Sequence, residues 1–149
     1  MNEKQFEDKL EITVKAMVNA PVETVWQCFT EPEHIKQWNN ASEDWHTPAA
    51  ENDLRAGGTF LYRMEAKDGS FGFDFSGIYD EVKLYENIAY SLGDERKVKI
   101  TFASEEGKTQ VTETFEAENT NPAKMQEAGW QSILDNFKRY VEGKMVDED

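Results

Sequence analysis

The segment Pro122–Glu142, PAKMQEAGWQSILDNFKRYVE, decides the fold because it predicts a long amphipathic helix at the end of the chain. Its large apolar residues recur at intervals of three and four, which is typical of a helix with one buried face. Asn121 and Pro122 suit an N-cap and a first helical position, and Gly143 suits a helix end. About 21 residues at a rise of 1.5 Å give roughly 31 Å. Such a helix can cross a whole sheet.

The chain before this helix is dominated by strand patterns. Leu10–Val18 alternates apolar and polar residues, which predicts a half-buried strand. About six further strand-like segments lie between Asp44 and Ala117. Short polar links such as Lys67–Ser70, with its Asp-Gly pair, predict antiparallel hairpins. A run of strands folded around a single helix leaves a space between sheet and helix, where we expect the function to lie.

Two parts of the strand run are expected to be irregular. Ser42–Thr47 is predicted as a strand and Pro48–Asn52 as a loop. Phe71 to about Lys83 is predicted as one long strand. Gly77 inside it is expected to mark a bulge or bend, since glycine has no side chain to pack. A bent strand would let the sheet curl around the helix.

Two short helical patterns, Pro21–Phe29 and Pro32–Trp38, follow the first strand. Thr30-Glu-Pro-Glu33 reads as a capping box for the second of them. The order of elements predicts an α+β fold with a curved antiparallel sheet of about seven strands. We expect one domain over residues 1–149, with loose termini at 1–9 and 144–149.

Composition narrows the range of partners. The 149 residues carry a net charge of −14, which disfavours nucleic acid and anionic membrane surfaces. Cys28 is the single cysteine, so an internal disulfide is impossible. No apolar run reaches the ~20 residues of a membrane helix, so no membrane insertion is expected. The polar N-terminus is unlike a secretory signal, and a cytoplasmic location is predicted.

Four stretches, in this order, resemble the SRPBCC (START-like, helix-grip) superfamily, and within it the branch related to the activator of heat-shock protein ATPase. They are Val18–Trp26, Asp53–Gly58, Gly77–Val82 and Ala128–Phe137. The resemblance implies a seven-stranded sheet gripping the C-terminal helix around an apolar cavity. It further implies a hydrophobic ligand such as a lipid, sterol or polyketide, a link to the stress response, and no shared catalytic residue. A pocket that binds such a ligand would need no cofactor.

An aromatic set is the main candidate for the walls of such a cavity, although buried aromatic residues can also be ordinary core. Its members are Phe60, Tyr62, Met64, Phe71, Phe73, Phe75, Tyr90, Trp130, Leu134 and Phe137. The residues favoured as ligand contacts are Tyr62, Phe73, Phe75, Tyr90, Glu113, Trp130, Leu134 and His46. No residue is assigned a catalytic or metal-binding role.

Glu113 is the most informative polar candidate. It shares its strand parity with Val111 and Phe115, so it should point inward. A carboxylate in an apolar pocket would have a raised pKa and could be a ligand anchor or a general acid. The alternative is a strand position that faces water.

The two histidines and the cysteine are weaker candidates for a functional role than Glu113. His46 is expected near the cavity mouth, as a ligand contact or base, or merely exposed. His34 is expected to face solvent and Cys28 to be a small buried filler. The histidines lack metal-ligand spacing, so no metal site is predicted.

Three hypotheses follow. The first is binding of a small hydrophobic molecule by a monomer or homodimer. The second is a cyclase or hydrolase with a cavity acid or base, for which a strongly raised pKa on an inward carboxylate would argue. The third is a chaperone-associated interaction module, for which a filled core and a contiguous exposed apolar patch would argue.

Overall fold

The computed structural model describes residues 10–147, which form a seven-stranded antiparallel sheet and three helices. The strands are β1 (Glu11–Val18), β2 (Trp45–Asn52), β3 (Thr59–Ala66), β4 (Gly72–Lys83), β5 (Asn87–Leu92), β6 (Lys97–Glu105) and β7 (Lys108–Glu116). The helices are α2 (Val22–Thr30), α3 (Pro32–Trp38) and α4 (Ala123–Asp147).

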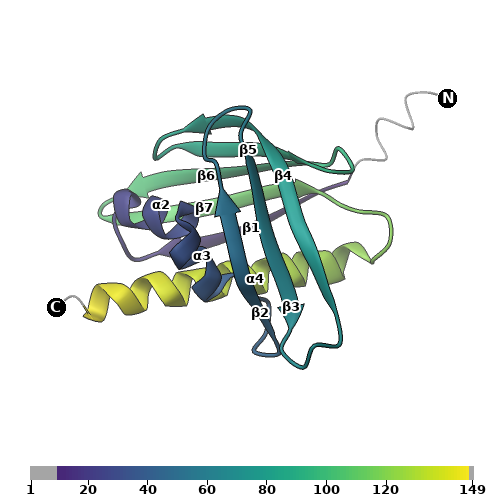
Figure 1. Cartoon of the computed structure of the whole chain (residues 1–149). Coiled ribbons are helices and arrows are strands. Elements are labelled where there is room, and N and C mark those ends of the chain that lie inside the picture. Colours follow the sequence, from purple (N-terminus) through teal and green to yellow (C-terminus); the bar gives the residue numbers. More distant parts are fainter. Residues whose placement is uncertain (1–9, 148–149) are drawn as a thin grey trace.

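The strand order β1-β7-β6-β5-β4-β3-β2 makes β1 and β2 the two edges of the sheet. The sheet curls, and α4 runs across its open side with α2 and α3 beside it (Figure 1). α4 packs along β1, and α3 packs against β2. This is the predicted helix-grip architecture, with two short helices after the first strand.

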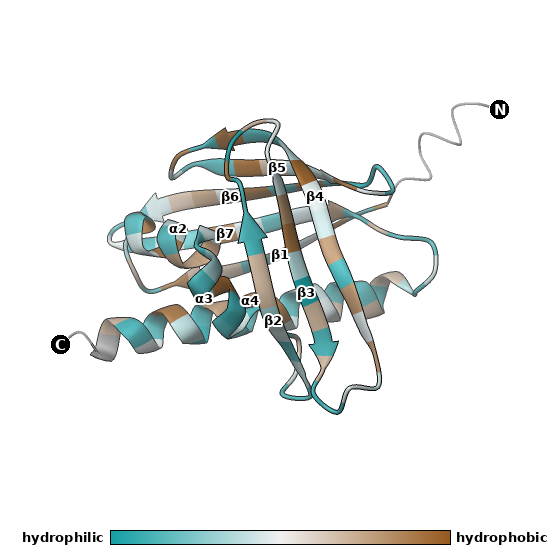
Figure 2. Ribbon diagram, in the orientation of Figure 1, coloured by the Kyte–Doolittle hydropathy of each residue, from teal (hydrophilic) through white to brown (hydrophobic). Residues whose placement is uncertain are grey.

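The strands form because their residues alternate in polarity. Along β1 every second residue, from Ile12 to Val18, is buried, and the residues between them are exposed. Figure 2 shows hydrophobic and hydrophilic residues alternating along the strands and around α4. Leu134, Phe137 and Val141 of α4 are almost fully buried in the core. The hydrophobic effect therefore fixes which face of each element turns inward.

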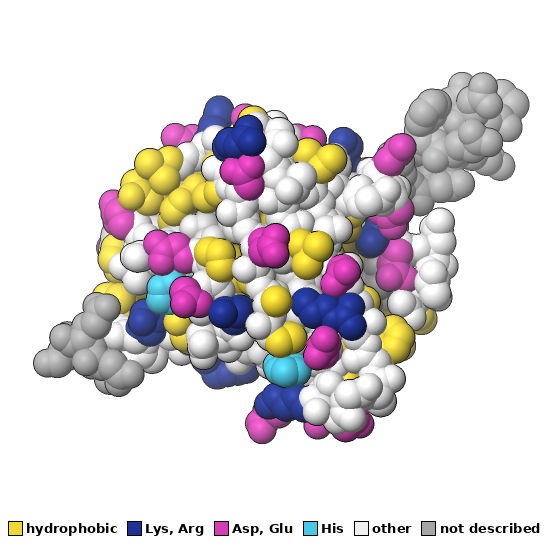
Figure 3. All heavy atoms as spheres, viewed as in Figure 1, with side chains coloured by type: hydrophobic (Ala, Val, Ile, Leu, Met, Phe, Trp, Pro, Cys, Tyr) yellow, Lys and Arg dark blue, Asp and Glu magenta, His cyan; other side chains and the backbone are white. Residues whose placement is uncertain are grey.

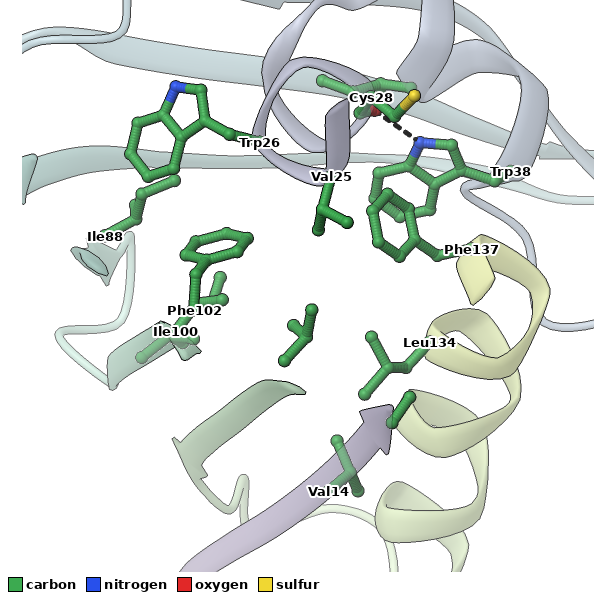
Figure 4. Packing of buried hydrophobic residues seen from close by; sticks show 14 of the residues in the cluster. Val14, Val25, Trp26, Cys28, Trp38, Ile88, Ile100, Phe102, Leu134 and Phe137 are labelled. Carbon is green, nitrogen blue, oxygen red and sulfur yellow. Dashed lines mark hydrogen bonds between the residues drawn. The ribbon is translucent and has the colours of Figure 1, made fainter. Parts of the chain in front are cut away.

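The core continues between α4 and the two short helices. Figure 4 shows Phe137 and Trp38 in contact, with Leu134 nearby above Val14. The rings of Trp38 and Phe137 lie 4.8 Å apart, edge to face. The Trp38 indole N–H donates to the Cys28 carbonyl oxygen at 2.9 Å, which satisfies its buried polar group. Cys28 is buried, as predicted.

The expected irregularity in the long strand is present, but it lies after Gly77. The register between β4 and β5 shifts between Tyr79 and Glu81, which marks a bulge. Two residues earlier, a Cβ atom on Gly77 would lie 2.7 Å from the Ser91 carbonyl oxygen and 2.9 Å from the Phe60 ring. Only glycine permits this close approach of β3, β4 and β5.

The expected loop at Pro48–Asn52 is wrong, because these residues belong to β2. β2 is an edge strand, and its register to β3 is irregular between His46 and Ala49. Pro48 lies in this irregularity. A missing N–H is tolerated at such a position, so proline does not end the strand.

The predicted helix ends also need correction. The Thr30 hydroxyl donates to the Trp26 carbonyl oxygen inside α2, and α3 begins without a side-chain cap. The Asn121 side chain binds Glu118 instead of capping α4, which begins at Ala123. α4 continues through Gly143 to Asp147, so residues 144–147 are helical. Residues 1–9 and 148–149 lie outside the described part of the chain.

Candidate functional site

A cavity of about 280 Å³ lies between the inner face of the sheet and α4. Most of its wall is aromatic or aliphatic, and residues from both short helices close one side. The lining residues are Phe29, Thr30, Trp38, Asn39, Asn52, Phe60, Tyr62, Met64, Phe73, Phe75, Tyr79, Ile88, Tyr90, Arg96, Ile100, Glu113, Glu118, Trp130 and Ile133.

The aromatic wall is built by ring-to-ring packing. The Phe60 ring lies 4.8 Å from Tyr90, edge to face, and 5.0 Å from Tyr62. Trp130 of α4 stacks on Phe115 with centroids 3.9 Å apart. A second ring contact is edge to face with Phe75, with centroids 6.3 Å apart. Trp130 thus connects α4 to both β4 and β7, and these ring contacts hold the wall in place.

A short polar chain runs through this wall. The Tyr79 hydroxyl donates to Asn52 Oδ1 at 2.6 Å, and Asn52 Nδ2 donates to the Thr30 carbonyl oxygen at 2.7 Å. Burial raises the pKa of Tyr79 to about 12 and holds those of Tyr62 and Tyr90 well above the ordinary tyrosine value. All three hydroxyl groups are therefore neutral near pH 7.

Glu113 points inward, as predicted, and is only 7% exposed. Its cross-strand neighbours are Val14 on β1 and Ile100 on β6. Burial among these apolar groups raises the pKa of its carboxyl group to about 8. No hydrogen bond or ion pair joins this carboxyl group to another residue of the described range 10–147. Glu113 is therefore mostly protonated near pH 7.

The other two charged residues of the wall, Arg96 and Glu118, have partners and are partly exposed. The Arg96 guanidinium donates to Asp94 Oδ2 at 2.7 Å. Glu118 Oε1 accepts from the backbone N–H and the side-chain amide of Asn121, both at 2.9 Å. Neither group is hydrogen-bonded to Glu113.

Six of the eight predicted contact residues line this one cavity. They are Tyr62, Phe73, Phe75, Tyr90, Glu113 and Trp130. Leu134 does not line it, because the face of α4 that meets the cavity presents Trp130 and Ile133. Leu134, only 1% exposed, packs in the core instead.

The expected place of His46 at the cavity mouth is wrong. His46 pairs with Glu65 across the β2–β3 ladder, and its Nε2 lies 3.9 Å from Glu65 Oε1. Glu65 Oε2 also accepts from Arg63 Nε of the same strand at 2.9 Å. This register puts His46 on the outer face of the sheet.

Other placements differ from expectation as well. His34 is half-buried rather than solvent-facing, because its Nδ1 lies 2.6 Å from the Tyr140 hydroxyl of α4. Phe71 is 62% exposed and lies outside the cavity wall. Asn52 was missed, since the sequence around Pro48 reads as a loop. Arg96, in the link between β5 and β6, belongs to no periodic pattern that would mark it as a wall residue.

The curled sheet, the long gripping helix and the cavity between them define a START-like, helix-grip protein. The chain belongs to the family described as Activator of Hsp90 ATPase homolog 1-like protein, whose model matches residues 19–142. No curated protein matches the chain.

Solved structures agree with this assignment. An AHSA1-like protein from Aeromonas hydrophila is 45% identical, with a TM-score of 0.86 over 92% of this chain and 95% of the other. A protein from Cytophaga hutchinsonii is 50% identical, with a TM-score of 0.78 over 91% and 94%. A protein from Nitrosomonas europaea, 22% identical with a TM-score of 0.78 over 93% and 98%, shares the fold.

Within residues 10–147, no helix is both long and apolar enough to cross a membrane. The same residues contain no group of three or more histidine, cysteine, aspartate or glutamate side chains placed to hold a metal ion.

Proposed function

We propose that the protein binds a small hydrophobic molecule in the cavity between the sheet and α4. The observation that carries this is the cavity itself, about 280 Å³ in volume, with aromatic walls and few polar groups. Small-molecule pockets have this composition and volumes of about 300–1,000 Å³, so the ligand is small. Each Å² of apolar surface that it buries contributes about 25 cal/mol.

The test is native mass spectrometry of the purified protein, followed by thermal shift with fatty acids, sterols and aromatic ketones. A bound small-molecule mass or a saturable rise in melting temperature supports the pocket. Trp130→Ala removes a wall residue and should abolish the ligand-induced rise. Trp26→Ala is the matched control, because Trp26 is a core tryptophan outside the cavity wall. Both variants will melt earlier, but only Trp26→Ala should retain the ligand-induced rise.

Equal ligand-induced shifts in the two tryptophan variants would place binding elsewhere. If none of the compounds raises the melting temperature of the protein, the interaction-module hypothesis becomes the favoured one. On the face drawn in Figure 3, most hydrophobic side chains are scattered among charged ones, and one larger hydrophobic group lies at the upper left. The aromatic-walled cavity is the observation that supports ligand binding over the interaction module.

One observation favours an enzymatic alternative. The pKa of Glu113 is raised to about 8, the property that a general acid working near neutral pH requires. Buried tyrosine hydroxyls lie in the same wall. If Glu113 transfers a proton, Glu113→Gln should stop conversion of a bound compound, followed by mass spectrometry, while its binding persists. Binding without chemical change in the unaltered protein would argue against this alternative.

A further inference from the structure

Glu113 is set in an apolar part of the cavity wall. Val14 and Ile100 flank it across the ladder, and Val111 and Phe115 lie on the same face of β7. All four neighbours are buried hydrocarbon or aromatic groups. The carboxyl group of Glu113 therefore meets polar material only through the cavity that it lines.

No residue of the described chain satisfies this carboxyl group. The ionisable groups that share the cavity wall with it are Tyr62, Tyr79, Tyr90, Arg96 and Glu118. Arg96 is bonded to Asp94, Glu118 to Asn121, and Tyr79 to Asn52. Tyr90 interacts electrostatically with Glu113, but no hydrogen bond joins the two side chains. β1 and β6 place Val14 and Ile100 beside Glu113, and α4 presents Trp130 and Ile133 to the cavity. Leaving a buried polar group without a partner is unfavourable, and a suitable ligand group can recover that cost.

The state of Glu113 indicates what that ligand group is. A protonated carboxyl group offers an O–H donor, so its complement is a hydrogen-bond acceptor. A cationic ligand would pair well only with ionised Glu113. The free-energy cost of removing both charges from water can exceed the attraction between them. Arg96, in the same wall, also opposes a second cation. A neutral acceptor meets neither penalty.

We propose, on the basis of the proposed function, that the cavity selects neutral, largely apolar molecules carrying a ketone, ester or ether oxygen that accepts a hydrogen bond from Glu113. The apolar body lies against the aromatic wall, and the single oxygen faces β7. Glu113 then sets the ligand's orientation as well as its class.

Three probes of similar shape test this by isothermal titration calorimetry at pH 6.5. They are 2-acetylnaphthalene, its alkene counterpart 2-isopropenylnaphthalene, and the cationic 1-(2-naphthyl)ethylamine. One hydrogen bond predicts that the ketone binds about fivefold more tightly than the alkene. The amine should bind most weakly. An amine that binds more tightly than the ketone would overturn the proposal.

Two variants identify the donor. Glu113→Leu removes the donor at similar volume, so it should bind the ketone no more tightly than the alkene. Glu113→Gln retains an N–H donor and should keep the ketone preference. At pH 9 the unaltered protein should lose much of its preference for the ketone over the alkene. Glu113 is then ionised and has no O–H group to donate, while burial keeps Tyr90 protonated. The ketone preference of Glu113→Gln should be the same at pH 6.5 and pH 9.

The possible failures are distinguishable. If both neutral probes bind equally and Glu113→Leu changes nothing, the pocket stands and the role of Glu113 is overturned. If none of the three probes binds saturably, the pocket and the inference fail together. A ketone preference that survives in Glu113→Leu would assign the donor to another group.

Discussion

At the scale of single residues, Glu113 shows what the sequence can and cannot reveal. Its parity with Val111 and Phe115 predicts an inward carboxyl group, and the structure confirms that orientation. The sequence could not show whether a cationic side chain pairs with the Glu113 carboxyl group. Arg96 reaches the same wall from the link between β5 and β6, where no periodic pattern indicates the position of a side chain. His46 was misplaced for a similar reason, since the register of an edge strand depends on its neighbour.

The raised pKa of Glu113 predicts an unusual pH dependence of stability. Between pH 4.5 and about 8 the folded state holds a proton that the unfolded state has released. The free energy of unfolding should therefore fall as pH rises through this window, by up to about 1.4 kcal/mol per pH unit. Above pH 8 this contribution levels off, because both states are ionised.

Urea unfolding at pH 5 to 9 measures this dependence. Glu113→Gln should flatten the slope, since an amide does not titrate. Glu105→Gln, at an exposed position of β6, is the control and should leave the slope unchanged. Parallel profiles for the unaltered protein and Glu113→Gln would show that the carboxyl group is not buried as described.

At the scale of elements, periodicity explains most of the fold. β1 and α4 were predictable because alternating and three-four patterns report directly on a buried face. The residues at which helices and strands begin and end were less predictable. Gly143 does not end α4, since its backbone is not in the left-handed region that a glycine stop uses. Pro48 lies within β2 because an edge strand tolerates a missing donor.

Gly77 provides a test of the close packing between β3, β4 and β5. Gly77→Ala would put a methyl group 2.7 Å from the Ser91 carbonyl oxygen, so it should destabilise by about 1–3 kcal/mol. Gly93→Ala is the matched control, because its added Cβ would meet no atom within 4 Å. Chemical denaturation of both variants measures the difference. Equal stabilities would contradict the close approach.

At the scale of the whole molecule, the order of elements predicts the architecture, and the family assignment agrees with it. Whether the aromatic residues fill the core or leave a void was not predictable. That outcome depends on a few ångströms in how Phe60, Phe75 and Trp130 pack, and no sequence pattern encodes it. Leu134 and Trp130 share one apolar stripe of α4, but only Trp130 reaches the cavity.

The most direct test of ligand binding in this cavity uses the tryptophan indole N–H signals in a ¹H–¹⁵N NMR titration with 2-acetylnaphthalene. The chain has four tryptophans. Trp38 and Trp130 line the cavity, whereas Trp26 packs in the core outside it. We predict saturable shifts of the Trp38 and Trp130 signals with little change in that of Trp26. Unmoved Trp38 and Trp130 signals at saturating probe, or shifts confined to other residues, would contradict the binding cavity.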